Sequence, residues 1–344
     1  RGPRTTGQGS GQRPTNGRKT HMNIGELRFT RRALFRKLGI GSASGAALLT
    51  GSRRSSAAAT ETPGKRDPTI CAFTESFQDL PIPEVCRLFR EIGLDGLDLT
   101  VRPGGHIAPE DAPRLLPEAV KAAHDHEVSI PMLTTGVTDA DPLSERLVAA
   151  AGELGIRRIK LGYYRYGEFG TLRKQLDDIR RHLVRVAAMA NKHGVLPCVH
   201  IHSGDTIPSH GTQLYELIHD MSPDEIGAYV DPMHMTIEGG SGGWRQGLDL
   251  LAPWIRITSI KNFQWRETDP DPPGQRRWRA VKVPIADGMA PLGEFLAALK
   301  ALGRGEIFTL HSEYQGGGSF RSLSTEECIE QTKVDFAYLR SLLS

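Results

Sequence analysis

The chain has 344 residues, 38% of them hydrophobic and 24% charged, and its formal net charge is +3. These values are typical of a globular protein with one large domain of about 200–280 residues. Much of the positive charge lies in the N-terminal region, so the rest of the chain is near neutral. A nucleic-acid partner bound through a basic face is therefore not expected.

The four cysteines are scattered along the chain and form neither a CxxC nor a CxxH cluster. This spacing argues against a zinc knuckle or a thioredoxin-type pair, and it favours buried free thiols. A disulfide in an exported protein is an alternative that the sequence leaves open.

The N-terminal region has the composition of a targeting segment. Residues 1–21 are polar and rich in Gly and Arg, which predicts a disordered tail, with Met22 as the natural start. Residues 22–59 contain a basic segment, a short apolar run and a small-residue cleavage site, which is the anatomy of a signal peptide.

The basic segment "TRRALFRK", which contains Arg31 and Arg32, resembles the twin-arginine export motif. We therefore expect export by the bacterial twin-arginine route, to the periplasm or the cell exterior; a merely basic disordered tail is the alternative. The apolar run is too short and too rich in Gly and Ser to span a bilayer, so no stable membrane span is expected.

After a linker at residues 60–68, segments typical of strands and helices alternate regularly. We expect strands within 69–76, 96–101, 129–136, 158–164, 195–202, 225–232, 255–263 and 306–314. We expect helices within 81–93, 109–127, 141–155, 171–194, 211–221, 241–254, 291–303 and 324–343, with Asp141 as a cap.

Eight such units predict an α/β fold, a single (βα)₈ TIM barrel over residues 69–344. An open, doubly wound sheet is the alternative, but no GxGxxG motif follows the first strand.

Polar residues gather where the predicted strands end. In a TIM barrel these carboxyl ends form the mouth that carries the active site. The residues are Asp98, Arg102, Tyr163, Arg165, His200, His202, Asp231, Lys261 and Glu313.

These side chains could bind a divalent cation. Because side chains alternate along a strand, His200 and His202 share a face, as do His311 and Glu313. Carboxylates and imidazoles from different strands suit one Mn, Zn, Fe or Co ion, which would polarise a sugar carbonyl and stabilise an enediolate. The alternative is that the imidazoles are buried, hydrogen-bonded structural groups and that the carboxylates form ion pairs with Lys261 or Arg165.

The chain from about residue 69 to its C terminus resembles the xylose isomerase-like TIM-barrel superfamily, in its sugar phosphate isomerase/epimerase branch. The resemblance rests on "GLDGLDLTVRPGGH", "RIKLGYYRY", "GVLPCVHIHSG", "YVDPMHM", "SIKNFQW" and "LHSEY" in this order. It implies one divalent metal held by a Glu, an Asp, a His and a Glu from strands five to eight. Asp231, followed by His234, matches the strand-six Asp, and Glu313 matches the strand-eight Glu.

Two positions depart from the family pattern. His200, in His200-Ile201-His202, stands where strand five commonly reads Glu-Asn-His, and Ser259 stands where strand seven commonly carries a His, although Lys261 is kept. The proton-transfer pair of such epimerases is often the strand-five and strand-eight glutamates, so the usual two-carboxylate epimerisation is not expected. The metal ligands expected here are His200, Asp231 and Glu313.

The remaining candidates are substrate contacts. Trp244 and Trp265 are expected in loops at the mouth, where they could stack on a sugar or anchor the loops. Arg102 and Arg165 could meet an anionic substrate or form buried salt bridges. Tyr163 and His234 are the other two expected substrate contacts.

The sequence thus predicts an exported sugar isomerase or epimerase that acts on a carbohydrate or polyol through an enediolate. Glu313, Lys261 and His202 are the expected catalytic residues. The alternatives are a lyase or hydrolase on an oxidised sugar or glycoside, a non-catalytic carbohydrate-binding barrel, and a nuclease on the same barrel. Homo-oligomerisation is left open.

Overall fold

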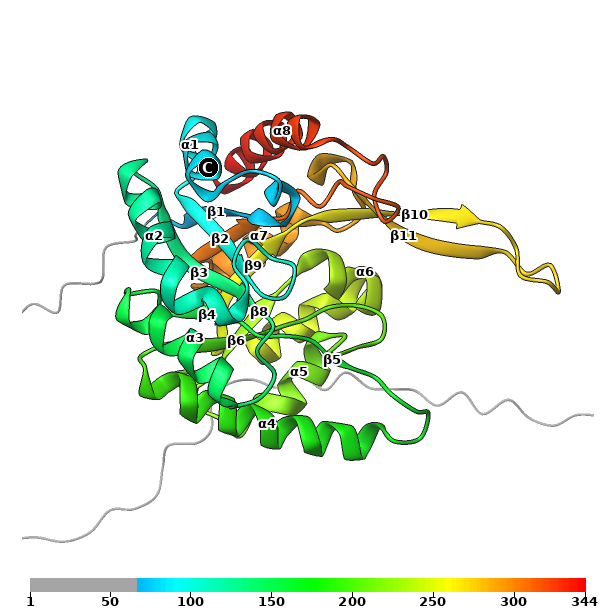
Figure 1. Ribbon diagram of the computed structural model, residues 1–344. Coiled ribbons are helices and arrows are strands. Elements are labelled where there is room, and N and C mark those ends of the chain that lie inside the picture. The colour runs from blue at the N-terminus through cyan, green and yellow to red at the C-terminus, as the bar shows by residue number, and fades with distance from the viewer. Residues whose placement is uncertain (1–66) are drawn as a thin grey trace, which may run out of the picture. The chain divides into compact units, whose positions relative to one another are not determined.

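The computed structural model describes residues 67–344 and contains the expected closed barrel of eight parallel strands (Figure 1). The strands follow one another around the barrel in the order β1-β12-β9-β8-β6-β4-β3-β2. Their bounds are β1 Thr69–Phe73, β2 Gly96–Val101, β3 Ser129–Thr135, β4 Arg158–Lys160, β6 Leu196–His200, β8 Gly227–Val230, β9 Ile255–Ile260 and β12 Ile307–Leu310.

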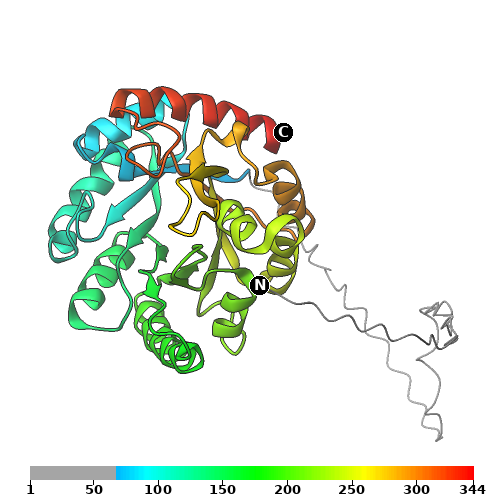
Figure 2. The ribbon, with the colours of Figure 1, turned by 90° about the vertical axis from the view of Figure 1, so that its right-hand side faces the viewer.

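Eight helices surround the barrel as a ring (Figure 2). Their bounds are α1 Ile82–Ile92, α2 Ala112–Asp125, α3 Pro142–Glu153, α4 Leu172–Lys192, α5 Gly211–Ile218, α6 Pro232–Leu251, α7 Leu292–Ala301 and α8 Thr325–Leu343. Three short 3₁₀ helices accompany them: η1 Thr74–Phe77, η2 Pro109–Asp111 and η3 Ile285–Asp287. The single TIM barrel predicted from the sequence is confirmed.

Local signals explain where the helices begin and end. Asp141 caps α3, as predicted, because its carboxylate accepts hydrogen bonds from the backbone N–H groups of Leu143 and Ser144. Gly93 ends α1 at a φ of 94°, a left-handed conformation in which a Cβ would be strained.

The core lies between the strands and the inner faces of the helices. All six residues of β2 are buried, and side chains such as Phe77, Phe89 and Phe295 are fully excluded from solvent. Each such side chain contributes about 1.5–3 kcal/mol through burial. The four cysteines are buried free thiols, as expected.

Helix α6 differs from the prediction. It begins at Pro232 rather than near residue 241, because Asp231 caps it through the backbone N–H of His234 and Pro232 suits the first helical position. The Gly-rich stretch expected as a loop is part of this helix, which is kinked at Gly240 (φ 59°). Trp244 is therefore on a helix, as the helix expected at 241–254 implied, and its expected place in a loop at the mouth is corrected.

Four short strands lie outside the barrel. Residues expected as a Pro-rich loop include a hairpin of β10 (Asn262–Thr268) and β11 (Arg277–Val283), which projects from the barrel in Figure 1. Trp265 is on this hairpin and not in a loop, because β10 extends the chain beyond β9 and pairs with β11 along its whole length. The other pair is β5 (Tyr164–Arg165) and β7 (Thr206–Ile207).

The expected tail, signal peptide and most of the linker, at residues 1–66, lie outside the described residues. Within residues 67–344, no helix is long and apolar enough to cross a membrane.

Candidate functional site

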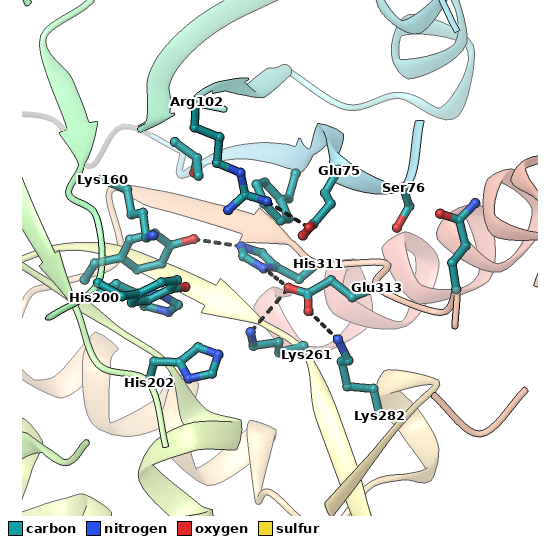
Figure 3. A pocket seen from close by; sticks show the side chains of 15 residues that line it. Glu75, Ser76, Arg102, Lys160, His200, His202, Lys261, Lys282, His311 and Glu313 are labelled. Atoms are coloured by element: carbon teal, nitrogen blue, oxygen red, sulfur yellow. Dashed lines mark hydrogen bonds and ion pairs between the residues drawn. The ribbon is translucent and has the colours of Figure 1, made fainter. Parts of the chain in front are cut away.

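The carboxyl ends of the barrel strands surround a cavity of about 330 Å³. Charged side chains near the ends of five barrel strands and from strand β11 of the hairpin line it, and Figure 3 shows them converging from opposite sides. They are Glu75, Arg102, Lys160, Lys261, Lys282 and Glu313. Arg102, Lys261 and Glu313 were among the residues expected at this mouth, whereas Glu75, Lys160 and Lys282 were not.

Lys261 lies at the centre of the charged group. It follows β9 directly, and its Nζ is 3.4 Å from Asp231 Oδ2 and 3.4 Å from Glu313 Oε1. Its side chain is only 4% exposed, and that of Asp231 is fully buried. Burial opposes the charge, but the carboxylates of Glu313 and Asp231 raise the pKa of Lys261 above its ordinary value, so the ammonium form is kept.

Glu313 has further cationic and imidazole partners. Its Oε2 accepts from Lys282 Nζ at 2.7 Å, and its Oε1 accepts from His311 Nδ1 at 2.8 Å. Burial disfavours its ionisation, but Lys261 and Lys282 hold the pKa of Glu313 well below its usual range. Glu313 is therefore an ionised carboxylate at neutral pH.

The side chain of His311 is oriented by two hydrogen bonds. Because its Nδ1–H donates to Glu313, its Nε2 accepts from the Tyr229 hydroxyl at 2.8 Å. The sequence placed His311 on the face of Glu313 but gave it no role. Its position on the same strand end, two residues before Glu313, was the available signal.

The predicted metal ligands do not fit a metal ion. Both ring nitrogens of His200 have partners, since Nε2 lies 3.3 Å from Asp231 Oδ2 and Nδ1 lies 3.1 Å from the Tyr163 hydroxyl. The Lys261 ammonium lies between Asp231 and Glu313, where a shared cation would have to lie, and a protonated amine cannot be a ligand. In the part of the chain that the structure describes, no three His, Cys, Asp or Glu residues are placed to hold a metal ion.

The pairing of Asp231 and Glu313 with Lys261 is the alternative that the sequence left open. Ser259, at the usual position of a His ligand, is buried, and its hydroxyl has no hydrogen-bond partner within the described residues. In the structure, His200, Asp231 and Glu313 thus belong to an ion-paired, hydrogen-bonded cluster around Lys261.

His202 offers a neutral imidazole to the cavity. Burial lowers the pKa of His202 to about 4, and the nearby Lys261 charge acts in the same direction. Its Nδ1 lies 3.0 Å from the Ser203 carbonyl oxygen, to which it donates, so the lone pair is on Nε2. Nε2 can therefore accept a proton or a substrate hydrogen bond.

Lys160, at the end of β4, is a site residue that the sequence reasoning missed. It lines the cavity, is 2% exposed, and places its Nζ 3.5 Å from the ring centroid of Tyr163. Figure 3 shows it on the same side as Arg102 and away from Lys282. The expected strand at residues 158–164 ran past Lys160, whereas the observed β4 ends at this residue and brings it to the mouth.

The other predicted substrate contacts divide into two groups. Arg102 and Tyr163 line the cavity, and Arg102 forms a 2.8 Å ion pair with Glu75. Outside the lining are His234, Arg165, Trp244 and Trp265.

Each of these four has a different environment. His234 is buried behind Ser203, whose Oγ is 2.8 Å from its Nδ1. Trp244 is buried against Phe295, with ring centroids 5.2 Å apart, so it packs α6 onto α7. Arg165 is exposed, and Trp265 is 41% exposed on the hairpin.

Known structures share this architecture. A 3-keto-D-glucoside 4-epimerase from E. coli matches with a TM-score of 0.57 and 14% identity, over 80% of this chain and 100% of that one. An L-ribulose 3-epimerase matches with a TM-score of 0.59 and 17% identity, over 80% and 95%. A xylose isomerase-like TIM barrel protein from Mycobacterium smegmatis, in complex with magnesium, matches with a TM-score of 0.57 and 16% identity, over 80% and 98%.

The model of one family, described as xylose isomerase-like TIM barrel, matches residues 86–337. The chain belongs to this family. No curated protein sequence matches it. Sugar epimerases are among the solved structures that share its fold.

Proposed function

We propose that this protein is a carbohydrate isomerase or epimerase in which the Lys261 ammonium performs the electrostatic task of a metal ion. The observation that carries the proposal is the position of Lys261 Nζ, 3.4 Å from both Asp231 and Glu313 at the floor of the mouth. The carboxylates of Asp231 and Glu313 converge on one position that suits a cation, and the Lys261 ammonium occupies that position.

The ammonium can stabilise charge that develops on a substrate oxygen. Removing the proton beside a sugar carbonyl places negative charge on oxygen, and preorganised donors in a dry site stabilise such charge strongly. Lys261 is 3% exposed and retains its proton, so its remaining N–H groups can donate to an enediolate oxygen. Lys282 also lines the cavity and is a second cation close to Glu313.

Two groups can move the proton at carbon. Glu313 is an ionised carboxylate, and His202 carries a free lone pair on Nε2. Both line the cavity. A pair of this kind supports proton removal by one group and return by the other, the general acid–base step of an isomerase or epimerase. The sequence alone predicts one Mn, Zn, Fe or Co ion instead; in this proposal that ion is not required.

We further propose that the substrate is a free sugar, a uronate or a glycoside rather than a sugar phosphate. The support is the twin-arginine-like segment before residue 60, since phosphorylated sugars are scarce outside the cytoplasm.

Solvent-exchange NMR tests the proposal. The purified protein is incubated in D₂O with a panel of ketoses, aldoses and uronates, and deuterium at the carbon beside the carbonyl is measured before and after chelation with EDTA. We expect incorporation for at least one sugar, unchanged by EDTA, and reduced by about 10²–10³ in Lys261→Met. Lys261→Arg, which keeps the charge, is the matched control. Tight sugar binding without exchange would overturn the proposal in favour of a binding barrel.

A further inference from the structure

Lys160 is a buried lysine with no carboxylate partner. It is 2% exposed, and no Asp or Glu within residues 67–344 forms an ion pair with it. Its Nζ instead lies 3.5 Å from the centre of the Tyr163 ring, and it lines the cavity. Lys261, in contrast, is held between two carboxylates. The two lysines of one cavity therefore have opposite electrostatic environments.

The surroundings of Lys160 make the free amine accessible at neutral pH. Burial lowers its pKa to about 7, and the positive charges of Arg102 and Lys261 act in the same direction, while Asp98 and Glu75 oppose them only in part. A free amine is a nucleophile toward carbonyl carbon, and desolvation beside other cations is how lysines are activated for this chemistry. At pH 7 an ordinary lysine is neutral in only about one molecule in two thousand.

The fold places this amine across the cavity from Glu313. In the order of the barrel strands, β4 and β12 are four positions apart in a ring of eight, so they are opposite walls. Lys160 ends β4, and Glu313 follows β12. A sugar held between these walls would present its carbonyl to Lys160 on one side and to Lys261 and Glu313 on the other (Figure 3).

Resting on the proposed function, we propose that Lys160 forms a Schiff base with the carbonyl group of an open-chain sugar substrate. The amine nitrogen bonds to the carbonyl carbon, and one proton moves from nitrogen to oxygen to give a carbinolamine. A proton from solvent then allows that hydroxyl to leave as water, which yields the protonated imine. No electrons are exchanged, and hydrolysis reverses the steps after the carbon proton has moved.

The imine explains how the site can acidify a sugar C–H bond without a metal ion. A protonated imine accepts the electron pair left on the neighbouring carbon, and the proton goes to a base such as the Glu313 carboxylate. Lys261 then holds the neighbouring hydroxyl oxygen. Lys160 thus binds the substrate covalently, and Lys261 donates to the neighbouring oxygen.

Borohydride trapping tests this inference. The whole protein is incubated at pH 7 with D-fructose, and separately with D-glyceraldehyde, then reduced with sodium borohydride and analysed by intact and peptide mass spectrometry. We expect one reduced sugar adduct per chain, on the peptide that contains Lys160. The exposed lysines Lys121 and Lys174 are internal controls, since each is ion-paired with an aspartate and we expect its modification to be much slower.

Two variants make the result decisive. Lys160→Met should lose the adduct while circular dichroism shows an intact barrel, and Lys261→Met should keep the adduct on Lys160. Labelling no faster on Lys160 than on the exposed lysines, with both probes, would overturn the inference. An adduct on Lys160 without deuterium exchange in any sugar would support a Schiff-base site and refute the isomerase proposal, so the two failures can be told apart.

Discussion

Replacing Lys261 by methionine should destabilise the protein strongly at neutral pH. Methionine has a similar length but no charge, so it leaves Asp231, which is fully buried, without its ammonium partner. Removing one partner of a buried ion pair costs about 3–5 kcal/mol. Glu313 still has Lys282 at 2.7 Å and His311 at 2.8 Å, so the loss falls mainly on Asp231, and we expect about 3 kcal/mol.

The effect should depend on pH in a defined direction. In the wild type, the lowered pKa of Asp231 contributes stability that is fully present above its unfolded pKa and is lost as pH falls through its folded pKa. In Lys261→Met, Asp231 is relieved by protonation as the pH falls. The difference in free energy of unfolding between the two proteins should therefore shrink between pH 7 and about pH 4.

Urea unfolding followed by circular dichroism at both pH values measures this difference. Lys282→Met is the matched control; its side chain is 26% exposed, and we expect a cost below about 1 kcal/mol. A loss at pH 7 that equals the control, or a loss that is the same at both pH values, would refute the electrostatic reasoning.

Three further predictions follow from the site and its supports. If Lys160 must be neutral, kcat/KM should rise with pH through about 7, and Lys160→Met should abolish activity at every pH, as a pH–rate profile will show. His202→Gln should lower kcat by about 10²–10⁴ with little change in thermal stability, measured by initial rates and thermal unfolding; an unchanged kcat would remove His202 from proton transfer. Asp141→Ala removes the cap of α3 and should cost about 1 kcal/mol in urea unfolding, whereas Asp141→Asn should cost less.

Much of the fold was predictable because its signals are local. The alternation of strand and helix patterns, with Asp141 and Gly93 at helix ends, fixed the barrel and therefore the mouth. Helix α6 was misplaced because a Gly-rich stretch usually breaks a helix, whereas here it kinks one at Gly240. The hairpin was missed because its prolines lie in the turn and not in the strands.

The chemistry of the site was less predictable, since it depends on distances between strands. The sequence brought Asp231, Lys261 and Glu313 to one mouth, but it could not show that the ammonium lies between the carboxylates. Nor could it show that Lys160 lies at a strand end without an ion-pair partner among residues 67–344, because both are properties of the folded state.

The most direct test of the central claim, that Lys261 acts in place of a metal ion, is the metal content of the purified protein. Plasma mass spectrometry is applied to the protein before and after incubation with Mn, Zn, Fe and Co salts, together with the rate of sugar C–H exchange. We predict well below one equivalent of any of these metals and an exchange rate that they do not raise. One equivalent per chain, lost in Glu313→Gln together with exchange, would contradict the account.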